Sequence, residues 1–531
     1  MSMFKELSPR SLPKIQENRL LHFAPVDADL IYGQIYRRDV IELGWPKDAV
    51  RVFEHLSKDN TIAVIGAMLG DEGKGRVVDN KVEALLTIPG IRQVIIVRFN
   101  GGNNAGHTVE GLDFHVVPSI MHPQTVGIID QGVVVHAEDL KTEVTYIEDV
   151  VGDTRGKLFV SERAILCTDI ERAEETLNGI RSKASQGGTG RGIAPSYAHY
   201  LERTGKLVRD LMSENWREEF AEYYEEKQKY FSSYGADMGS VLVPDFQSSH
   251  EKGESITRPL GSKNEFLDRL ENARTWLIER RIVDDTFNMQ MEILEDTRKK
   301  ALILEAAQAV GLHYRVGTYP DVTASDTSIY GVVAGTGLWR PQDIKERIGV
   351  FKATYTSDVG ARIMPTRIHL PQDIENTSNN LTREQKRAAW IIEEGHEYGT
   401  TTRRPRSINF LDLPMLRHNA WMSGIEMLVA THLDMARENE PIKVCTYYTD
   451  KSGNVVKYKP DLDYLANVVP HYKELPGWHG ETCRKAKNIN QLPDNAIKYL
   501  AYIQAMTGYP IVAATTGPKR ENLVAFPGWQ T

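Results

Sequence analysis

The chain contains the stretch Gly70-Asp71-Glu72-Gly73-Lys74-Gly75, shortly after an apolar run at residues 61–65. The glycines allow a sharp turn that brings backbone N–H groups against an anion, and Lys74 adds a positive charge for phosphate oxygens. A glycine-rich turn that leaves a buried strand is typical of nucleotide-binding α/β folds. The stretch therefore predicts an α/β domain with a P-loop-like nucleotide-binding core.

Asp71 is unusual in such a loop. A carboxylate among groups that attract anions is repelled by phosphate, unless a cation lies between them or the carboxylate removes a proton from a reacting group. The ordinary phosphate-loop pattern is also not met, because Met68 replaces its first glycine and Gly75 replaces its Ser or Thr. We therefore expect this loop to take part in chemistry as well as binding.

A second strand and glycine-rich loop follow. The apolar run at residues 93–99 leads into Asn100-Gly101-Gly102-Asn103-Asn104-Ala105-Gly106-His107-Thr108. Four apolar residues between the two runs have helical spacing: Val78, Val82, Leu85 and Leu86. This predicts a strand, a crossover helix and a parallel strand, with both loops at the edge where open α/β sheets bind ligands. There His107 is a candidate general acid, and the Gly106 carbonyl is a candidate ligand for Mg²⁺.

These two loops resemble those of the adenylosuccinate synthetase family, whose patterns are G-D-E-G-K-G and G-G-x-N-A-G-H-T. The resemblance continues in order over residues 60–531. Further matching segments begin at Gly188, Leu304, Gly317, Glu397, Thr431 and Thr515. It implies one large domain around a mainly parallel central sheet.

The resemblance also implies a ligase that joins L-aspartate to IMP in purine biosynthesis, with GTP as co-substrate and Mg²⁺ as cofactor. Asp71 would take the proton from N1 of IMP, so that the 6-oxygen attacks the γ-phosphate of GTP and forms 6-phosphoryl-IMP. His107 would donate a hydrogen bond or a proton to the transferred group, and Lys74 would help to neutralise charge. Mg²⁺ would be held by Asp71 and the Gly106 carbonyl, and the amine of aspartate would then displace phosphate.

Other site residues follow from the resemblance, substrate by substrate. Gln308 is expected to act in catalysis and in binding the purine. The expected IMP-binding residues are Asn104, Thr189, Arg203, Gln308 and Thr323. The expected aspartate-binding residues are Thr401, Thr402 and Arg404. The expected GTP-binding residues are Gly73, Lys74, Gly75, Thr108, Arg406, His432, Asp434, Thr515 and Gly517. Arg203 matches an arginine that the family supplies to the neighbouring subunit, which implies a homodimer.

Side-chain chemistry alone leaves alternatives at some of these positions. Arg404 and Arg406 can form bidentate hydrogen bonds with a dicarboxylate, or can belong to a solvated basic loop. Asp434, after the apolar run at residues 425–430, could accept two hydrogen bonds from a guanine edge or could cap the next helix. Gln308 could pair with a purine or satisfy a buried backbone group.

The sequence departs from the family pattern in places. His432 stands where the family usually has a lysine, which leaves both GTP and ATP open as phosphoryl donors. Arg315 and Asp358 exchange charge sign relative to the pattern, and we predict that they form a compensating ion pair. A phage branch of the family makes 2-aminoadenylosuccinate from dGMP, but it typically has a smaller residue in place of Asp71, so we expect IMP here.

An alternative of another class is a catalytically silent nucleotide-binding or GTPase-like protein. Such a protein has no need of both the acid His107 and the base Asp71, and a switch would need the Ser or Thr that Gly75 replaces.

Composition limits the remaining choices. The 531 residues include 64 Lys and Arg against 72 Asp and Glu, and this net charge of −8 argues against nucleic acid or an anionic membrane as a partner. Cys167, Cys445 and Cys483 are too scattered for a disulfide framework or a zinc site, which fits the cytoplasm. No apolar run approaches the roughly eighteen residues of a membrane span, and the start of the chain lacks a signal-type segment.

Two segments lie outside the core pattern. Residues 1–59 mix apolar and charged positions, so we expect an extension that packs on the catalytic domain or across a dimer interface. Residues 212–298 form an enlarged insertion. Apolar positions at its two ends predict helices, and the composition of residues 232–261, rich in Ser, Gly and Pro, predicts a loop. We expect this insertion to be a solvent-exposed addition to the fold and not a regulatory domain.

Overall fold

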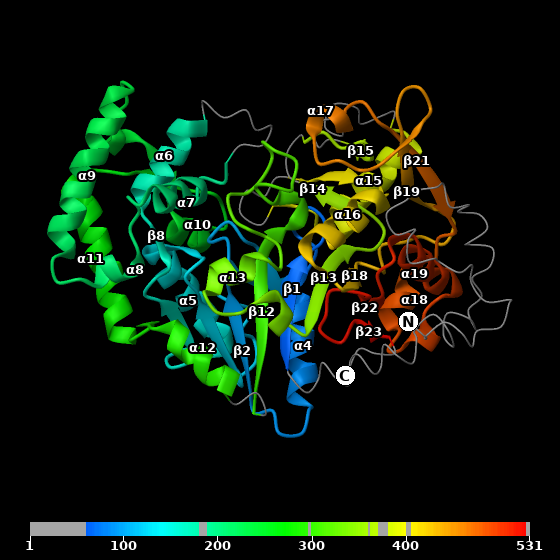
Figure 1. Ribbon diagram of the computed structural model, residues 1–531, viewed down its shortest axis with the longest axis horizontal. Helices are drawn as coiled ribbons and strands as arrows, with labels where there is room; N and C mark the ends of the chain where they lie inside the picture. Colours follow the sequence, from blue (N-terminus) through cyan, green and yellow to red (C-terminus); the bar gives the residue numbers. More distant parts are fainter. Residues whose placement is uncertain are drawn as a thin grey trace.

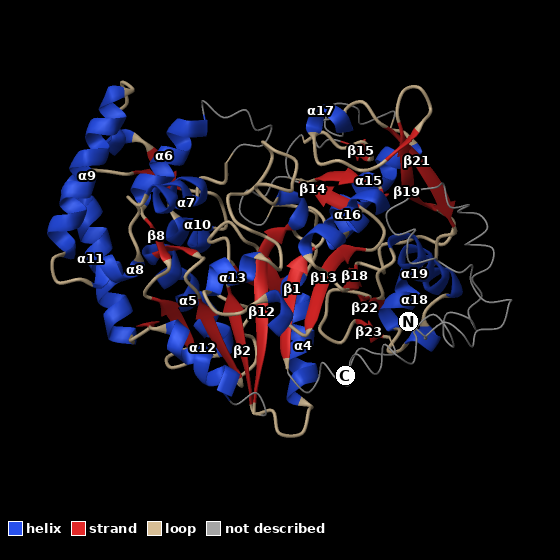
Figure 2. Ribbon diagram, viewed as in Figure 1, coloured by secondary structure: helices blue, strands red, loops and turns tan. Residues whose placement is uncertain are grey.

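The computed structural model describes residues 60–179, 188–295, 299–358, 362–369, 381–399 and 405–526. Helices cover both faces of a central, strongly twisted sheet, as Figures 1 and 2 show. This is the α/β architecture with a mainly parallel sheet that the sequence predicts. The predicted extension at residues 1–59 lies outside the described residues.

The central sheet has ten strands in the described part of the chain, in the order β11-β7-β5-β2-β12-β1-β13-β18-β22-β23. In that order the strands span Val283–Asp284, Leu158–Ser161, Thr125–Ile129, Gln93–Arg98, Lys300–Ala309, Thr61–Gly66, Glu346–Lys352, Met427–Thr431, Ile511–Thr515 and Leu523–Ala525. Every neighbouring pair is parallel except β22 and β23.

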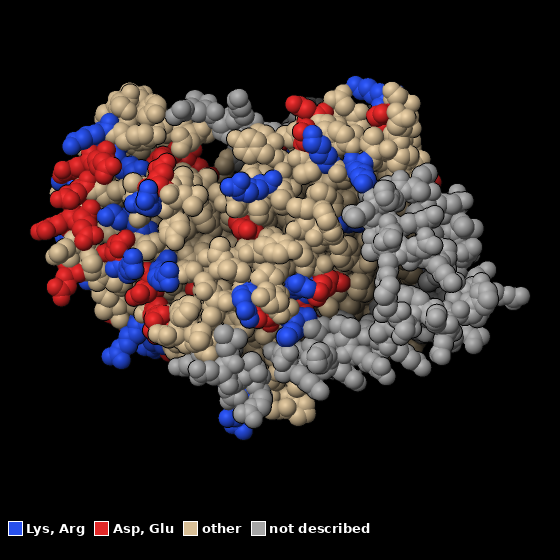
Figure 3. All heavy atoms as spheres, in the orientation of Figure 1, with Lys and Arg blue, Asp and Glu red and all other residues tan. Residues whose placement is uncertain are grey.

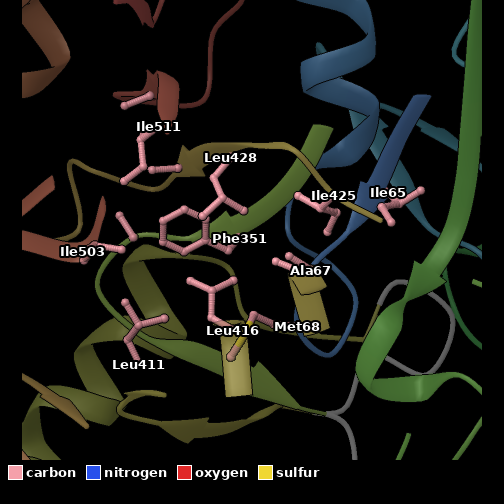
Figure 4. Packing of buried hydrophobic residues seen from close by; sticks show 14 of the residues in the cluster. Ile65, Ala67, Met68, Phe351, Leu411, Leu416, Ile425, Leu428, Ile503 and Ile511 are labelled. Carbon is pink, nitrogen blue, oxygen red and sulfur yellow. The ribbon is translucent and has the colours of Figure 1, made fainter. Parts of the chain in front are cut away.

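Strand β1 lies near the middle of the sheet and is buried on both faces. Ile62 and Val64 belong to the hydrophobic cluster on one face, while Ala63 and Ile65 belong to the cluster on the other. A parallel strand covered on both sides has this continuous apolar sequence instead of an alternating one. Figure 4 shows the second cluster, where Phe351 and Leu428 pack between Leu416 and Ile511.

The first cluster joins the sheet to helices α4 (Lys74–Leu86), α5 (Ala137–Val151), α9 (Trp216–Ser233) and α11 (Lys263–Arg280). The second joins it to α16 (Leu413–Ser423) and α19 (Asp494–Thr507). Helix α4 is the predicted crossover after β1. Its chain continues into β2, but β12 lies between β1 and β2 in the sheet.

The insertion differs from its prediction in the middle. Helices α9 and α11 confirm its helical ends. The predicted loop between them is wrong in part, because it contains the paired strands β9 (Leu242–Pro244) and β10 (Thr257–Pro259) and helix α10 (Phe246–Lys252). Charged side chains crowd the outer edge over α9 and α11 (Figure 3), yet Phe220, Phe266 and Leu270 on their inner faces are buried in the core. The insertion is therefore only partly solvated.

A smaller sheet packs beside the main one. Strands β17 (Leu411–Asp412), β19 (Ile442–Thr449), β20 (Val455–Val456) and β21 (Val469–Leu475) form it. Among the described residues, no helix is long and apolar enough to cross a membrane.

Candidate active site

The candidate site lies along the carboxyl edge of the central sheet. Strands β1, β2, β12, β13, β18 and β22 are mutually parallel, so the segments that follow them emerge at the same edge. These segments carry most of the residues that the sequence singles out. Residues far apart in the chain are thus brought together by the topology.

The loop after β1 is held by a buried carboxylate. Glu72 accepts hydrogen bonds from the backbone N–H groups of Met68 (3.2 Å) and Gly70 (2.7 Å), and its other oxygen lies 3.3 Å from Lys74 Nζ. The hydroxyl of Thr431, at the end of β18, donates to the Glu72 carbonyl at 2.8 Å. Glu72 therefore fixes the shape of the loop and keeps the buried Lys74 ammonium at its centre.

Two glycines allow the loops to approach one another. A Cβ on Gly66 would lie 2.5 Å from Glu72 Oε2 and 2.7 Å from the Gln308 carbonyl. A Cβ on Gly101 would lie 2.5 Å from Ala307, at a backbone φ of +76° that disfavours other residues. Side chains at these positions would push the ends of β1 and β2 away from β12.

Asp71 meets a chain of buried charges. Its carboxylate Oδ2 lies 2.9 Å from Arg406 Nη2, and Arg406 Nη1 lies 2.8 Å from Glu397 Oε2. Glu397 is fully buried and also pairs with Lys352, and these two cations hold the pKa of Glu397 well below its usual range despite burial. The Asp71 side chain is one-third exposed, so its carboxylate lies at the mouth of this buried network.

His107 lies on a second buried network. Its Nδ1 is 2.6 Å from Glu305 Oε1 and 2.9 Å from Arg98 Nη1, and Glu305 also accepts from the hydroxyl of Ser119. The short contact with a carboxylate indicates that Nδ1 carries the proton. Burial, together with the positive charges of Arg98 and Lys74, lowers the pKa of His107 to about 4, despite the opposing effect of Glu305. His107 is therefore neutral at pH 7 in this state.

Several buried polar atoms in this region have no protein partner in the described part of the chain: Asn104 Oδ1, His107 Nε2 and Gln308 Nε2. A buried polar group costs free energy unless it is hydrogen-bonded, so these atoms indicate where a polar ligand binds. Asp71, Gln308 and His432 also have positive φ values of 54°, 55° and 57°. Such backbone strain in non-glycine residues clusters at functional sites.

The second loop is joined to the segment at residues 188–195. Asp139, at the start of α5, accepts from Asn103 and pairs with Arg172 and Arg191. Together these positive groups hold the pKa of Asp139 well below its ordinary value. Thr189 is exposed in this segment.

Arg203 caps the C-terminus of α7 (Ile193–Glu202) with a φ of +65° and is exposed. It therefore lies at the surface of the described part of the chain.

The far end of the edge is formed by β18 and β22. The backbone N–H of His432 donates to Thr515 Oγ1 at 3.2 Å, and Asp434 Oδ2 accepts from Arg484 Nε at 2.8 Å. Gly517 approaches Asn522 so closely that a Cβ would lie 2.8 Å from Asn522 Oδ1. Burial and the charge of Lys352 lower the pKa of His432 to about 4.

Other predicted residues lie at the rim. The Thr323 N–H donates to the Leu312 carbonyl, and Leu312 lies next to Gly70. The exposed Thr108 hydroxyl donates to Asp113 at 2.5 Å in the hairpin of β3 (His107–Val109) and β4 (Leu112–Phe114). Gly73 lies beside Thr431, and Gly75 lies beside His107. The predicted aspartate-binding residues lie outside the described residues: Thr401, Thr402 and Arg404.

The predicted pair of Arg315 and Asp358 is wrong. Asp358 lies 3.4 Å from Arg362 Nε, and both are fully buried. The Arg315 guanidinium instead lies over the ring of Tyr314, 5.5 Å from its centre, and has no ion pair in the described part of the chain. Asp358 and Arg315 therefore contact separate neighbours, Arg362 and Tyr314, instead of each other.

Four acidic residues of the site were not identified from the sequence: Glu72, Asp139, Glu305 and Glu397. Glu72, Glu305 and Glu397 lie inside the segments that carry the resemblance, so they could have been identified as candidates from their positions. Asp139 had no such signal, because its partners are separated from it in the chain.

A cluster behind the site resembles a metal centre. Ligand atoms of His136, Glu138 and Asp169 lie within 4.8 Å of one another. Arg258 Nη2 lies 3.2 Å from Glu138 and 2.9 Å from Asp169, and Arg269 Nη2 lies 3.1 Å from Asp169. These guanidinium groups already occupy the position that a cation would take, so the cluster is an ion-pair network.

The comparisons with known proteins agree on one family. The family model described as adenylosuccinate synthetase matches residues 63–524. A protein of Clostridium botulinum (strain Eklund 17B / Type B) named adenylosuccinate synthetase is 34% identical over 477 residues, which cover 87% of this chain and 98% of its own. A protein of the same name from Meyerozyma guilliermondii is 33% identical over 475 residues, covering 87% and 99%.

A solved structure is also similar. The fully ligated adenylosuccinate synthetase from Plasmodium falciparum has a TM-score of 0.72 and 28% sequence identity, covering 88% of this chain and 99% of that one.

Proposed function

This chain belongs to the adenylosuccinate synthetase family, whose members are ligases that form a C–N bond, and from that premise we propose how its own residues act. The proposed reaction joins L-aspartate to IMP, with GTP as phosphoryl donor and Mg²⁺ as cofactor. The observation that carries the proposal is the juxtaposition of Asp71, Lys74, His107 and Gln308 at one sheet edge, with unpaired polar atoms among them.

Asp71 is proposed as the base that takes the proton from N1 of IMP. Its carboxylate lies at the mouth of the site, and Arg406 holds one oxygen at 2.9 Å. Loss of the N1 proton makes the 6-oxygen of the purine a nucleophile toward the γ-phosphate of GTP. The left-handed backbone at Asp71 supports this role, because such strain in a non-glycine residue clusters at functional sites.

Lys74 and His107 are proposed to act on the transferred phosphoryl group. Lys74 is only 2% exposed and its ammonium is held by Glu72 at 3.3 Å, so it offers a preorganised positive charge. His107 presents its unpaired Nε2, while Glu305 fixes Nδ1. A negative phosphoryl group nearby would favour the protonated ring, which then donates a hydrogen bond.

The residues fit Mg²⁺. Asp71 offers a carboxylate oxygen, and the Gly106 carbonyl accepts no hydrogen bond in the described part of the chain. Carboxylate and carbonyl oxygens, completed by phosphate oxygens and water, are the ligands that this hard cation prefers. When bound, Mg²⁺ would neutralise charge on the phosphates.

Substrate binding is proposed as follows. Gln308 Nε2 and Asn104 Oδ1 are unpaired polar atoms that can bind IMP, with Thr189, Thr323 and a partner's Arg203 as further contacts. For L-aspartate, the proposal rests on the resemblance alone: Thr401, Thr402 and Arg404. For GTP, the residues around β18 and β22 and the phosphate loop are proposed, together with Thr108 and Arg406.

Two further parts of the proposal concern the molecule as a whole. We propose a homodimer, supported by the exposed position of Arg203 at the end of α7. We also propose a cytoplasmic enzyme, supported by three buried thiols, Cys167, Cys445 and Cys483.

The test is a direct assay. The protein is incubated with IMP, GTP, Mg²⁺ and L-aspartate, and adenylosuccinate is followed by its ultraviolet absorbance; dGMP in place of IMP, and ATP in place of GTP, complete the series. Absence of product from IMP with either donor would overturn the assignment.

Asp71→Asn should lower kcat by about 10³-fold, since general base catalysis contributes on the order of 10²–10⁴. The change keeps the size of the side chain but removes its basicity, so KM for IMP should change little. Asp149→Asn, on the exposed side of α5, is the matched control and should keep full activity. A kcat of Asp71→Asn within tenfold of the control would show that another group takes the proton.

A further inference from the structure

The contact between Asp434 and Arg484 lies at the donor-base end of the site. Asp434 follows β18, and Arg484 lies on the short helix α18 (Gly480–Lys485). Arg484 Nε donates to Asp434 Oδ2 at 2.8 Å. Figure 1 shows α18 beside β22 and β23, on the side of the molecule where β18 ends.

This contact leaves hydrogen-bonding groups unused on both partners. Asp434 Oδ1 accepts no hydrogen bond from the described residues, and Oδ2 keeps a second lone pair. Arg484 Nη1 is 3.7 Å from Glu481 Oε2, which is beyond hydrogen-bond distance, and the Arg484 side chain is 38% exposed. The pair therefore presents two acceptor oxygens and neighbouring N–H donors side by side.

The backbone fixes the pair against the loop that follows β22. The Arg484 carbonyl accepts from Asn522 Nδ2 at 3.0 Å, and Asn522 Oδ1 accepts from the Lys519 N–H at 3.0 Å. A Cβ on Gly480 would lie 2.1 Å from the Asp434 carbonyl, so α18 begins in direct contact with Asp434. Asn522 thus connects the Arg484 backbone to the loop that contains Gly517, which is one of the residues proposed to contact the base.

We propose that Arg484 is a specificity-determining residue of the donor-nucleotide site, which orients the Asp434 carboxylate and donates a hydrogen bond to the 6-oxo group of the base. This inference rests on the proposed function, in which Asp434 faces the base of the donor nucleotide.

The chemistry of the two purines gives the pair its selectivity. Guanine presents N–H donors at N1 and at its 2-amino group, which suit the carboxylate, and an oxygen acceptor at C6, which suits the guanidinium. Adenine presents an acceptor at N1 and an amino donor at C6. Adenine would therefore bring acceptor against acceptor and donor against donor, and the site would reject ATP.

The neighbouring histidine makes Arg484 more important. Burial lowers the pKa of His432, so its ring adds no positive charge at neutral pH. Arg484 keeps its charge at every physiological pH. Of these two residues, Arg484 on α18 therefore supplies a positive charge near the base and His432 does not.

The experiment compares Arg484→Gln with Lys485→Gln. Both variants remove one positive charge from α18, but the Lys485 side chain is 75% exposed and lies 3.6 Å from Glu481. Initial rates are measured with GTP, ITP and ATP as donors at saturating IMP and aspartate, and KM for IMP is measured separately. Arg484→Lys tests whether a positive charge without the planar guanidinium group is sufficient for selectivity between the donors.

Arg484→Gln should raise KM for GTP by about tenfold to a hundredfold, the range for one good polar contact to a base. ITP has the same 6-oxo group and should lose a similar factor, while kcat/KM with ATP should stay constant or rise. KM for IMP should not change. Lys485→Gln should match the unmodified protein with every donor, and Arg484→Lys should recover only part of the loss.

Two results would overturn the inference. One is a GTP KM in Arg484→Gln within twofold of that in Lys485→Gln. The other is an equal loss with GTP, ITP and ATP together with a raised KM for IMP, which would indicate general damage to the fold.

Calorimetric binding of GDP and ADP separates this inference from the proposed reaction. If the unmodified protein makes no adenylosuccinate, the proposed function fails, yet weaker GDP binding by Arg484→Gln than by Lys485→Gln would still support the inference. If the unmodified protein binds GDP no more tightly than ADP, the inference fails even when the reaction proceeds.

Discussion

Three residues of the site have a left-handed backbone although none is glycine: Asp71, Gln308 and His432. A non-glycine residue in this conformation costs on the order of 1 kcal/mol, so the surrounding contacts must impose it. Each of the three follows or ends a strand of the central sheet, where the chain turns sharply. The strain is therefore concentrated at the carboxyl edge of the sheet, where the candidate site lies.

The protonation state of His107 leads to a prediction. In the structure its pKa is lowered to about 4, because burial and two nearby cations outweigh Glu305. A bound triphosphate brings negative charge, which favours the charged ring and raises this pKa toward neutrality. At pH 6, binding a non-hydrolysable GTP analogue with IMP and Mg²⁺ should therefore take up a proton, up to one per site.

Calorimetry in buffers of different ionisation enthalpy measures this uptake directly. The dependence of the binding enthalpy on the buffer gives the number of protons, and His107→Asn should reduce it by the share that the ring contributes. Equal uptake by the variant and the unmodified protein would show that His107 stays neutral and acts only as a hydrogen-bond partner.

At the scale of elements, helix α4 connects two distant parts of the site. It begins at Lys74, beside the phosphate loop, and within its first turn Arg76 Nη1 donates to the Pro518 carbonyl at 2.5 Å. The carboxylate of Asp79 receives two hydrogen bonds from Arg520, at 2.6 and 2.7 Å. The Asp79 carboxylate of this bidentate pair is buried, whereas the Arg520 side chain is 35% exposed.

Asp79→Asn should therefore loosen the loop at residues 516–522 and raise KM for GTP several-fold. The lost charge-assisted pair is worth about 1.5–3 kcal/mol at most, of which only part reaches the nucleotide. kcat should change little, because Lys74 remains held by Glu72. Steady-state kinetics with GTP as the varied substrate checks this, and Glu83→Gln, whose carboxylate is 44% exposed and 3.5 Å from Arg520, is the control. A lowered kcat at unchanged KM would contradict the connection.

The elements also show how much the sequence could predict. Apolar periodicity predicted α4, α9, α11 and the strands β1, β2 and β18, because each buries a continuous face or run. It could not predict that β12 separates β1 from β2, since strand order depends on contacts between residues far apart in the chain. The hairpin and helix at residues 238–259 were missed because Met238, Val243 and Phe246 are single buried residues in a polar segment, without a period.

The site was predictable to a similar extent. The loops could be located from their glycines, and their convergence followed from the parallel sheet. The partners of Asp71 could not be identified from the sequence, because Arg406 and Glu397 belong to a distant part of the chain. The contact of Arg484 with Asp434 also had no sequence signal, since α18 has no apolar pattern that sets its orientation.

At the scale of the whole molecule, the proposed dimer predicts that each site uses residues of both chains. Asp71→Asn and Arg203→Ala would each inactivate the homodimer, the first through its own site and the second through the neighbour's. Mixing equal amounts of the two variants and allowing exchange should restore about a quarter of the normal activity, because half of the dimers are hybrids with one intact site. Activity is assayed before and after exchange.

Each variant mixed with unmodified protein serves as the control for exchange. No recovery in the mixed sample, while the controls show that subunits do exchange, would mean that Arg203 acts within its own chain.

The central position of β1 has a consequence for how a cell makes this protein. Thr61–Gly66 is buried along its whole length, yet its sheet neighbours β12 and β13 begin only at Lys300 and Glu346. The first of these neighbours, β12, begins about 230 residues after β1 ends, and at roughly 5–20 residues per second the ribosome needs on the order of 10 to 50 s to synthesise that stretch. Throughout that time the nascent strand has no native neighbour, so chaperones that shield it during translation should decide how much active enzyme accumulates.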